Sequence, residues 1–293
     1  MLDLLGLDKK ILPHVLPSDD VYGKINPQIA AELGLSTETL VIAGGADNSC
    51  AAIGNGVTRM GQAVISIGTS GTVVAMLDSA PKTITGRVHI FNYSFPDRLY
   101  AMGCMLCAGE SLSWLSDLLN IGYDELNTLA EAAPAGADGL IFLPYLFGER
   151  CPVANPNARG IFFGLNRQHG AAHMARAVME GVAHNIRAML DEVAEIAEIN
   201  EFYITGGGAK SPIWGQIIAD IIGHEIAVLN IEEGPAFGAA LIAAVGAQLY
   251  PDFDTAKADF LKVARRITPA NQGFYDKPHE HFRNIYKANA PLM

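Results

Sequence analysis

The sequence predicts an α/β fold in which a β-sheet is flanked by helices, and three observations lead to this prediction. Short apolar runs rich in β-branched residues alternate with helical patterns along the 293 residues. Half of the residues are hydrophobic and only 17% are charged, which is typical of a globular chain with a sizeable core. Residues 171–198 place an apolar side chain at every third or fourth position, which is the period of one helix face.

The same patterns place the individual elements. Strands are expected near 39–43, 63–67, 72–76, 87–94, 98–104, 139–143, 201–205 and 226–229. Besides 171–198, helices are expected at 48–54, 109–119, 124–132, 212–222, 235–248 and 254–264, with a peripheral helix in the tail from 265 onward. Pro152 and Pro156 predict a loop over 148–160. In that loop Glu149 and Arg150 are adjacent, either as a structural ion pair or as a gate for a substrate.

Composition and charge exclude several classes of protein. The net charge of −11 argues against a general nucleic-acid or anionic-membrane surface, so we expect neither nucleic acid nor a membrane as partner. The chain does not open with a basic segment followed by an apolar one, and no apolar run approaches about 18 residues, so we expect a soluble protein that is not exported. Four cysteines are too few for a disulfide scaffold. The expected location is the cytoplasm.

The segment 63–76, AVISIGTSGTVVAM, predicts two apolar strands joined by a tight turn. Gly68 and Gly71 allow positive φ angles, which lets backbone N–H groups converge on one point, and Thr69 and Ser70 add hydroxyl groups. Such a concave set of donors binds a phosphate oxyanion without any lysine. An ordinary glycine-containing hairpin turn explains the same residues.

A second glycine cluster occurs in the stretch ITGGGAKSPIW. Gly206, Gly207 and Gly208 follow an expected strand, and Ser211 with the proline after it is typical of the start of a helix. The N-terminus of that helix would offer free N–H groups to an anion or to a polar ring. The stretch is neither a P-loop nor a dinucleotide fingerprint, because Ala209 precedes the lysine and Ser211 replaces the third glycine. Close packing of strand and helix is the alternative explanation for the glycines.

Asp47 is the only acid in VIAGGADNSC, where two glycines follow the end of what the pattern predicts to be a buried strand. Three interpretations are open at this point. Asp47 caps the helix that begins near Asn48, since aspartate is a preferred N-cap residue. It binds a metal, although a hard cation needs more oxygen ligands than one local acid supplies, so we assign no metal ligand. Or it is a general base that the glycines bring close to a substrate.

Together these motifs resemble those of the FGGY family of carbohydrate kinases. The stretch GIFFGLNRQHGAAHMARAVME fits the second signature of that family in full, from Gly160 to Glu180, and the resemblance runs from about residue 5 to 285. Kinases of this family resemble actin and hexokinase, with ATP in the cleft between two domains. The resemblance therefore implies an α/β ribonuclease-H-like fold, the actin/hexokinase type of ATPase, with a mixed sheet flanked by helices.

The resemblance covers only half of such a kinase. The first domain of the family normally opens with an Asp-x-Gly-Thr phosphate loop, and the nearest glycine-threonine pair here, Gly68–Thr69, matches the second domain. We therefore expect residues 1–293 to form the C-terminal, nucleotide-binding domain, without the N-terminal sugar-binding domain that would be its partner. The face that meets this partner should be exposed and apolar, and a homodimer through it is a further hypothesis.

The resemblance also implies roles for individual residues. Asp47 matches the catalytic aspartate, which takes the proton from the attacking sugar hydroxyl, although Ala46 replaces a glycine usual in the family. Thr69 matches a position at the terminal phosphates of ATP, Ser113 one beside the nucleotide and Ser211 one around the adenosine. The implied nucleotide-binding residues are Gly68, Thr69, Ser70, Gly71, Gly109, Ser113, Gly206, Gly207, Gly208 and Ser211.

The function implied is phosphorylation of a ketose sugar by ATP with Mg²⁺, with D-xylulose as the first candidate substrate. Phosphoryl transfer needs positioning and charge stabilisation more than covalent chemistry, and the turn amides, Mg²⁺ and Asp47 would supply these. The isolated chain is expected to be inactive without an N-terminal domain. The alternatives are a non-catalytic actin-like module that binds a nucleotide or a protein partner, and a kinase for gluconate, ribulose or glycerol. The failed dinucleotide fingerprint disfavours a nicotinamide-dependent oxidoreductase.

Overall fold

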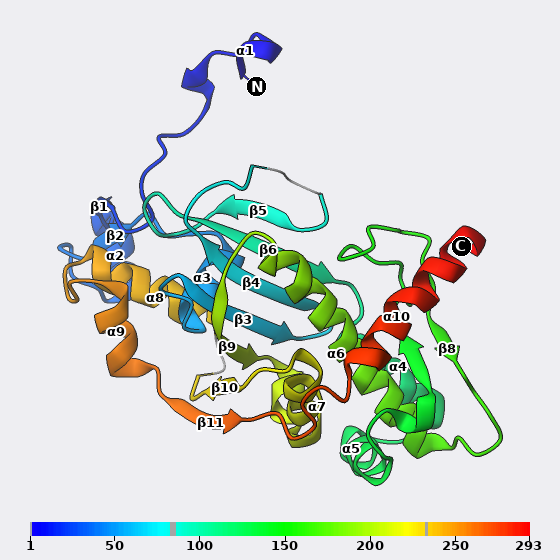
Figure 1. The fold of residues 1–293 in the computed structure, drawn as a ribbon. Coiled ribbons are helices and arrows are strands. Elements are labelled where there is room, and N and C mark those ends of the chain that lie inside the picture. The colour runs from blue at the N-terminus through cyan, green and yellow to red at the C-terminus, as the bar shows by residue number, and fades with distance from the viewer. Residues whose placement is uncertain (1, 83–85, 232–233) are drawn as a thin grey trace.

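A mixed seven-stranded sheet forms the centre of the computed structural model, which describes residues 2–82, 86–231 and 234–293 (Figure 1). The strands are β1 (Val21–Lys24), β2 (Leu40–Ile42), β3 (Gly61–Ile67), β4 (Gly71–Leu77), β5 (His89–Asn92), β6 (Leu99–Met105), β7 (Ile141–Leu143), β8 (Ile161–Phe163), β9 (Ile199–Thr205), β10 (Ile226–Leu229) and β11 (Val263–Ile267). The helices are α1 (Leu2–Leu5), α2 (Pro27–Leu33), α3 (Asp47–Gly54), α4 (Gly109–Leu119), α5 (Tyr123–Ala132), α6 (Ala171–Ala194), α7 (Pro212–Ile222), α8 (Gly234–Gly246), α9 (Phe253–Phe260) and α10 (Asp276–Asn289).

The order of the strands in the large sheet brings the carboxyl ends of β3 and β9 to the same edge. The order is β11-β10-β9-β3-β4-β6-β5, in which β3, β9 and β10 are parallel and the other neighbouring pairs are antiparallel. In the parallel pair β3–β9, Ser66 lies opposite Thr205. The turns that follow at Gly68 and Gly206 therefore leave the sheet side by side. The mixed sheet with flanking helices confirms the predicted α/β class.

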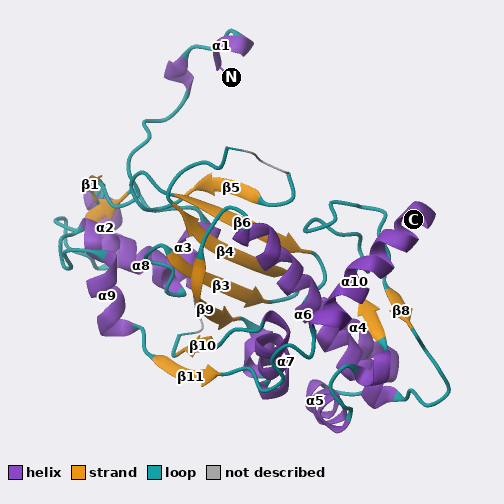
Figure 2. Cartoon of the chain, in the orientation of Figure 1, coloured by secondary structure: helices purple, strands orange, loops and turns teal. Residues whose placement is uncertain are grey.

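The two faces of the sheet are covered by different helices (Figure 2). Side chains alternate along a strand, so Ile65 and Val73 point to one face, and Val64 and Val74 point to the other. The first face packs against α4, α5, α6 and α7. The second face packs against α3, α8 and α9. The chain thus forms three layers, helices on both sides of a sheet.

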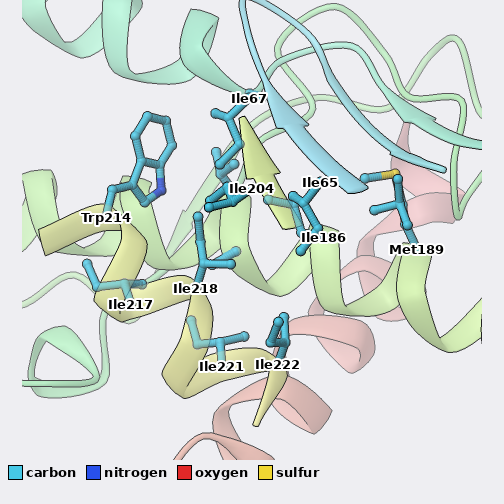
Figure 3. Packing of buried hydrophobic residues seen from close by; sticks show 14 of the residues in the cluster. Ile65, Ile67, Ile186, Met189, Ile204, Trp214, Ile217, Ile218, Ile221 and Ile222 are labelled. Carbon is cyan, nitrogen blue, oxygen red and sulfur yellow. The ribbon is translucent and has the colours of Figure 1, made fainter. Parts of the chain in front are cut away.

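Helix α6 supplies much of the larger core. Figure 3 shows Ile186 and Met189 of α6 packed together with Ile65 and Ile204 of the sheet and with Ile218 of α7. This confirms the apolar period predicted for 171–198, although the helix ends at Ala194, because β9 begins soon afterwards at residue 199.

The structure confirms all eight expected strands and the loop over 148–160. It also contains β1, β8 and β11, which the sequence patterns do not predict. The helix expected over 254–264 is too long, because α9 ends at Phe260 and Val263 begins β11, an edge strand that pairs with β10. The tail does form helix α10, whose Phe282 is buried in a small separate cluster.

Two local expectations are wrong. The strand before Asp47 is not buried, since β2 pairs only with β1 in a separate two-stranded sheet and Leu40 and Val41 are exposed. Gly68 and Gly71 do not have positive φ angles. Gly71 is needed for space instead, because a Cβ there would lie 2.9 Å from Cγ of Met105.

Candidate functional site

A cavity of about 490 Å³ lies where β3 and β9 end. Three stretches that are distant in the sequence form it, namely the turn after β3, the beginning of α4 and the segment between β9 and α7, and α5 closes one side. Its lining residues are Ile67, Gly68, Thr69, Gly109, Glu110, Leu112, Ser113, Tyr123, Asp124, Asn127, Gly207, Gly208, Lys210, Ser211 and Trp214. The cavity thus lies at the carboxyl ends of two parallel strands, where ligands of α/β proteins commonly bind.

The turn after β3 is held by the first residues of α4. The amide of Gly109 donates to the carbonyl oxygen of Gly68 at 2.8 Å, and the amide of Glu110 donates to that of Thr69 at 3.1 Å. A Cβ at Gly109 would lie 2.5 Å from the oxygen of Gly68, so only glycine permits this approach. These amides at the beginning of α4 are thereby used by the turn itself.

The tip of the turn keeps free donors. Thr69 and Ser70 are exposed, and their backbone N–H groups donate no hydrogen bond to any residue that the structure describes. The amide of Gly68 donates to the carbonyl oxygen of Ser70 at 3.0 Å, which closes the turn. Two adjacent free amides and two hydroxyl groups can bind an anionic oxygen.

The three glycines after β9 differ in their surroundings. Gly206 has a φ angle of +89°, and a Cβ there would lie 2.5 Å from the oxygen of Ile67. A Cβ at Gly208 would lie 2.4 Å from Cγ2 of the same Ile67, whereas one at Gly207 would meet no atom within 4 Å. Close packing of backbone against the sheet therefore explains Gly206 and Gly208, while Gly207 faces open space at the cavity.

Ser211 begins α7, as expected. Its Oγ accepts a hydrogen bond from the amide of Trp214 at 3.2 Å, with Pro212 at the first helical position. The same hydroxyl donates to Oδ1 of Asn127 on α5 at 2.7 Å. Ser211 thus links two walls of the cavity.

The structure brings together most of the predicted nucleotide-binding residues. Those that line the cavity are Gly68, Thr69, Gly109, Ser113, Gly207, Gly208 and Ser211. Ser70, Gly71 and Gly206 do not line it. The wall formed by Tyr123, Asp124 and Asn127 was missed, because polar residues at the start of an amphipathic helix look like an ordinary solvated face.

Asp47 lies apart from the residues that line the cavity. It is exposed at the first residue of α3, and its Oδ1 accepts the amide N–H of Asn48 at 2.7 Å. Ala46, not Asp47, is the N-cap residue and no side chain caps the helix, so the N-cap interpretation is wrong.

Two glycines form the turn before Asp47. Gly44 has a φ angle of +78°, and a Cβ at Gly45 would lie 2.0 Å from Oγ of Ser94. Ser94 is itself fixed by a 2.7 Å hydrogen bond to Oγ of Ser49 in α3. The turn that presents Asp47 therefore leaves no room for a Cβ at Gly45 and, through its positive φ angle, favours glycine at Gly44.

Glu149 holds the connection between β6 and α4 through hydrogen bonds. Its Oε1 accepts the amides of Leu106 at 3.0 Å and Arg150 at 2.8 Å, and its Oε2 accepts Nδ2 of Asn185 at 3.2 Å. Only 2% of Glu149 is exposed, and this burial raises the pKa of its carboxyl from 4.5 to about 8 despite these hydrogen bonds. Among the described residues Glu149 forms no salt bridge with Arg150, so the expected ion pair is absent.

No helix among the described residues is long and apolar enough to cross a membrane. The same residues contain no group of three or more histidine, cysteine, aspartate and glutamate side chains placed to hold a metal ion.

Comparison with known families agrees with the geometry of the site. The model for the C-terminal domain of the FGGY family of carbohydrate kinases matches residues 63–247, which include every lining residue of the cavity. The chain belongs to the FGGY family of carbohydrate kinases. The model for the N-terminal domain of this family matches residues 1–54. This match corrects the expectation that the chain contains no part of the N-terminal domain, and it includes Asp47.

Individual relatives are mostly xylulose kinases. The chain is 39% identical over 287 residues to the xylulose kinase of Staphylococcus epidermidis, covering 96% of this chain and 58% of the relative. It is 34% identical to the xylulose kinase of Escherichia coli K12, covering 100% of this chain and 61% of the relative. The chain therefore spans about three fifths of the length of these curated relatives.

Solved structures confirm the fold. The xylulose kinase from Rhodospirillum rubrum matches with a TM-score of 0.90 at 30% identity, covering 99% of this chain and 60% of that one. The gluconate kinase from Lactobacillus acidophilus matches with a TM-score of 0.92 at 26% identity, with the same coverage. These proteins have the actin/hexokinase-like fold, as expected for the chain.

Proposed function

We propose that the chain is the nucleotide-binding and base-bearing part of an ATP-dependent kinase for a ketose, with D-xylulose as the first candidate. The observation that carries this proposal is the cavity of about 490 Å³, which gathers the turn after β3, the start of α4 and the segment before α7. The names of the relatives, mostly xylulose kinases, support the choice of substrate.

The residues of the cavity fit a nucleotide with its metal ion. Free amides at Thr69 and Ser70 suit phosphate oxygens, and Tyr123 offers a ring for the base. Glu110, whose amide is bonded to the turn at Thr69, supplies a carboxylate, the ligand type that Mg²⁺ prefers in addition to the phosphates. Bound Mg²⁺ would neutralise part of the charge on the phosphates.

Asp47 would accept the proton of the attacking sugar hydroxyl. Its carboxylate is exposed at the first residue of α3, where a substrate can approach it. Transfer of the proton to so weak a base should come late, as the hydroxyl oxygen loses electron density to phosphorus.

We further propose that residues 1–54 act with the N-terminal domain, on the sugar side, and that the rest of the chain belongs to the nucleotide side. The exposed apolar side chains of the first 41 residues support a protein partner for this segment. The N-terminal domain of the family and a second copy of the chain are the two candidates. A monodisperse monomer in light scattering would contradict the homodimer.

The test is a coupled assay that measures ADP release from MgATP with D-xylulose, run on the complete kinase in which the chain is joined to an N-terminal domain. Asp47→Asn should lower kcat by about 10²- to 10⁴-fold and leave the affinity for MgATP unchanged, because only proton transfer is affected. Asp117→Asn, an exposed aspartate on α4, is the matched control and should keep full activity. Turnover by the Asp47 variant at the rate of the parent would disprove the role as base.

The same assay separates the other candidates. Gluconokinase from Bacillus subtilis is 31% identical to the chain, so D-gluconate should be tested beside D-ribulose and glycerol. Calorimetry with MgATP should show binding even where turnover is absent. Binding of MgATP without turnover on any of these substrates, with an N-terminal domain supplied, would favour a non-catalytic module, and no binding would disprove the nucleotide site.

A further inference from the structure

We propose that the chain has a second ligand site, separate from the nucleotide cavity at the ends of β3 and β9, and that this site binds a small sugar phosphate. The site is a cavity of about 330 Å³ between α6, α10 and the loop over 148–160, called the α6–α10 cavity below. Helix α10 lies against α6, where the ring centroids of His184 and Phe282 are 5.5 Å apart (Figure 1).

The α6–α10 cavity is distinct from the nucleotide cavity, and the two share no lining residue. Trp214 of the nucleotide cavity donates from Nε1 to the carbonyl oxygen of Met179 on α6 at 3.1 Å. Glu192 lines the α6–α10 cavity near the other end of the same helix. At about 1.5 Å per residue, Met179 and Glu192 lie roughly 20 Å apart along α6. A small ligand of one cavity therefore does not compete for the residues of the other.

Glu192 indicates that the ligand carries hydroxyl groups. Only 7% of this residue is exposed, and its Oε1 accepts a hydrogen bond from Nη1 of Arg87 at 2.7 Å. Its Oε2 is buried without a hydrogen-bond partner among the described residues, which costs stability. Because Glu192 lines the cavity, an occupant can supply the missing donor. Arg87 already balances the negative charge, so a neutral hydroxyl group suffices and a second cation is not needed.

Two basic residues of α10 indicate that the ligand also carries a phosphate. Arg283 and Lys287 are exposed, line the cavity and stand one helical turn apart, so their like charges lie on the same face of α10. Lys287 forms no hydrogen bond or ion pair with any described residue, and Arg283 approaches Oδ2 of Asp191 only to 3.7 Å. A phosphate, with a charge of about −1.5 to −2 at pH 7, would relieve the repulsion between the two and accept hydrogen bonds from both.

The remaining properties of the α6–α10 cavity suit a small sugar between these two ends. Phe282 and Tyr145, both almost completely buried, add aromatic surface on which the C–H groups of a sugar can pack. The volume is near the lower limit of the roughly 300–1,000 Å³ usual for small-molecule sites. Three basic residues and one acid line the cavity, although the chain as a whole has a net charge of −11. This local positive charge attracts an anion to an acidic protein.

The test is titration calorimetry of the chain with D-ribose 5-phosphate, D-ribose and inorganic phosphate. D-Ribose 5-phosphate should bind at least about 10-fold more tightly than either of the others, because each of these contacts only one end of the cavity. The titration is repeated with excess MgATP, which should leave the affinity for D-ribose 5-phosphate unchanged because the two cavities share no residue.

Variants assign the binding to the α6–α10 cavity. Arg283→Gln and Lys287→Gln should each lower the affinity for D-ribose 5-phosphate by about 10-fold, the effect of losing one hydrogen bond to a charged group. Lys277→Gln removes the same charge from α10 outside this cavity and should have no effect. Glu192→Gln should weaken D-ribose 5-phosphate more than inorganic phosphate. Thermal unfolding shows whether this buried variant folds, and the two exposed variants of α10 test the site in either case.

The outcomes separate this inference from the proposed function. Absence of D-ribose 5-phosphate binding at millimolar concentration would overturn the site, and so would an equal loss of affinity in Lys277→Gln. Displacement of D-ribose 5-phosphate by MgATP would place it in the nucleotide cavity and overturn the inference as well. Failure of MgATP itself to bind would instead overturn the proposed nucleotide site and leave the α6–α10 cavity unaffected.

Discussion

The cavity and Asp47 are held in place by different kinds of structure. The cavity is formed by backbone that packs directly on backbone, as at Gly109, where no Cβ fits, and its walls α4 and α7 belong to the largest core cluster. Asp47 stands at the exposed start of α3, after the exposed strand β2. In Figure 1 the segment before β1 extends away from the sheet, and the residues of α1 are not buried.

This difference between the cavity and Asp47 agrees with the two family models, which match different parts of the chain. Every lining residue of the cavity lies within 63–247, which matches the C-terminal domain, whereas Asp47 lies within 1–54, which matches the N-terminal domain. Helix α3 is nonetheless anchored to α8, since a Cβ at Gly54 would lie 2.0 Å from the oxygen of Gly234. The cavity is therefore built from closely packed backbone, whereas Asp47 stands on an exposed turn of two glycines.

The largest effect should come from the buried carboxyl of Glu149, which is bonded to the connection between β6 and α4. Burial raises the pKa of Glu149 from 4.5 to about 8, so the folded chain keeps a proton that the unfolded chain loses. This contribution to stability is complete below pH 4.5 and is lost as the pH rises through 8. Between pH 5 and 8 the free energy of unfolding of the parent chain should fall. That of Glu149→Gln, which resembles the protonated form, should fall less, by on the order of a few kcal/mol.

Urea unfolding at several pH values measures this difference. Glu201, whose pKa is lowered to about 2, provides the control, because Glu201→Gln should not reproduce the change between pH 5 and 8. Parallel pH dependence in the parent chain and in Glu149→Gln would show that Glu149 is ionised in the folded protein. The pH dependence of stability would then not distinguish the two regions.

How far the sequence predicts this molecule depends on where the information lies. The strands of the large sheet carry continuous apolar runs, and α6 carries a clear helical period, so both were predicted. The edge strand β11 reads VARRI, whose apolar residues stand mainly at its ends, and it was predicted partly as helix. The exposure of β2 depends on which strand it pairs with, and this pairing has no local signal.

The candidate site shows the same limit. The turn at Thr69 and the cap at Ser211 have local signals in glycine and serine, and both were predicted. Asn127 has no such signal, because its place in the cavity wall depends on a hydrogen bond to Ser211, 84 residues away. Contacts between distant segments fix the wall formed by α5, and a single sequence does not contain them.

An intermediate effect should come from the turn that α4 holds. Gly109→Ala places a Cβ 2.5 Å from the oxygen of Gly68, where only backbone could move, so we expect a loss of about 1–3 kcal/mol in the free energy of unfolding. Gly207→Ala is the matched control, because its Cβ meets no atom within 4 Å. Gly207→Ala should leave stability nearly unchanged and weaken MgATP binding. Equal stability of the two variants in urea would contradict direct packing of α4 on the turn.

The smallest effect should come from the turn of two glycines before Asp47. Gly44 has a φ angle of +78° with no atom within 4 Å of a Cβ, so Gly44→Ala meets backbone strain alone, about 1 kcal/mol. Because this strain acts on the turn that presents Asp47, kcat of the complete kinase should fall while MgATP affinity stays constant. Gly44→Asn, which tolerates this backbone conformation better, should recover part of the loss. Weaker MgATP binding in Gly44→Ala, measured by calorimetry, would show that the turn before Asp47 and the cavity are coupled. The two regions would then not be held in place independently.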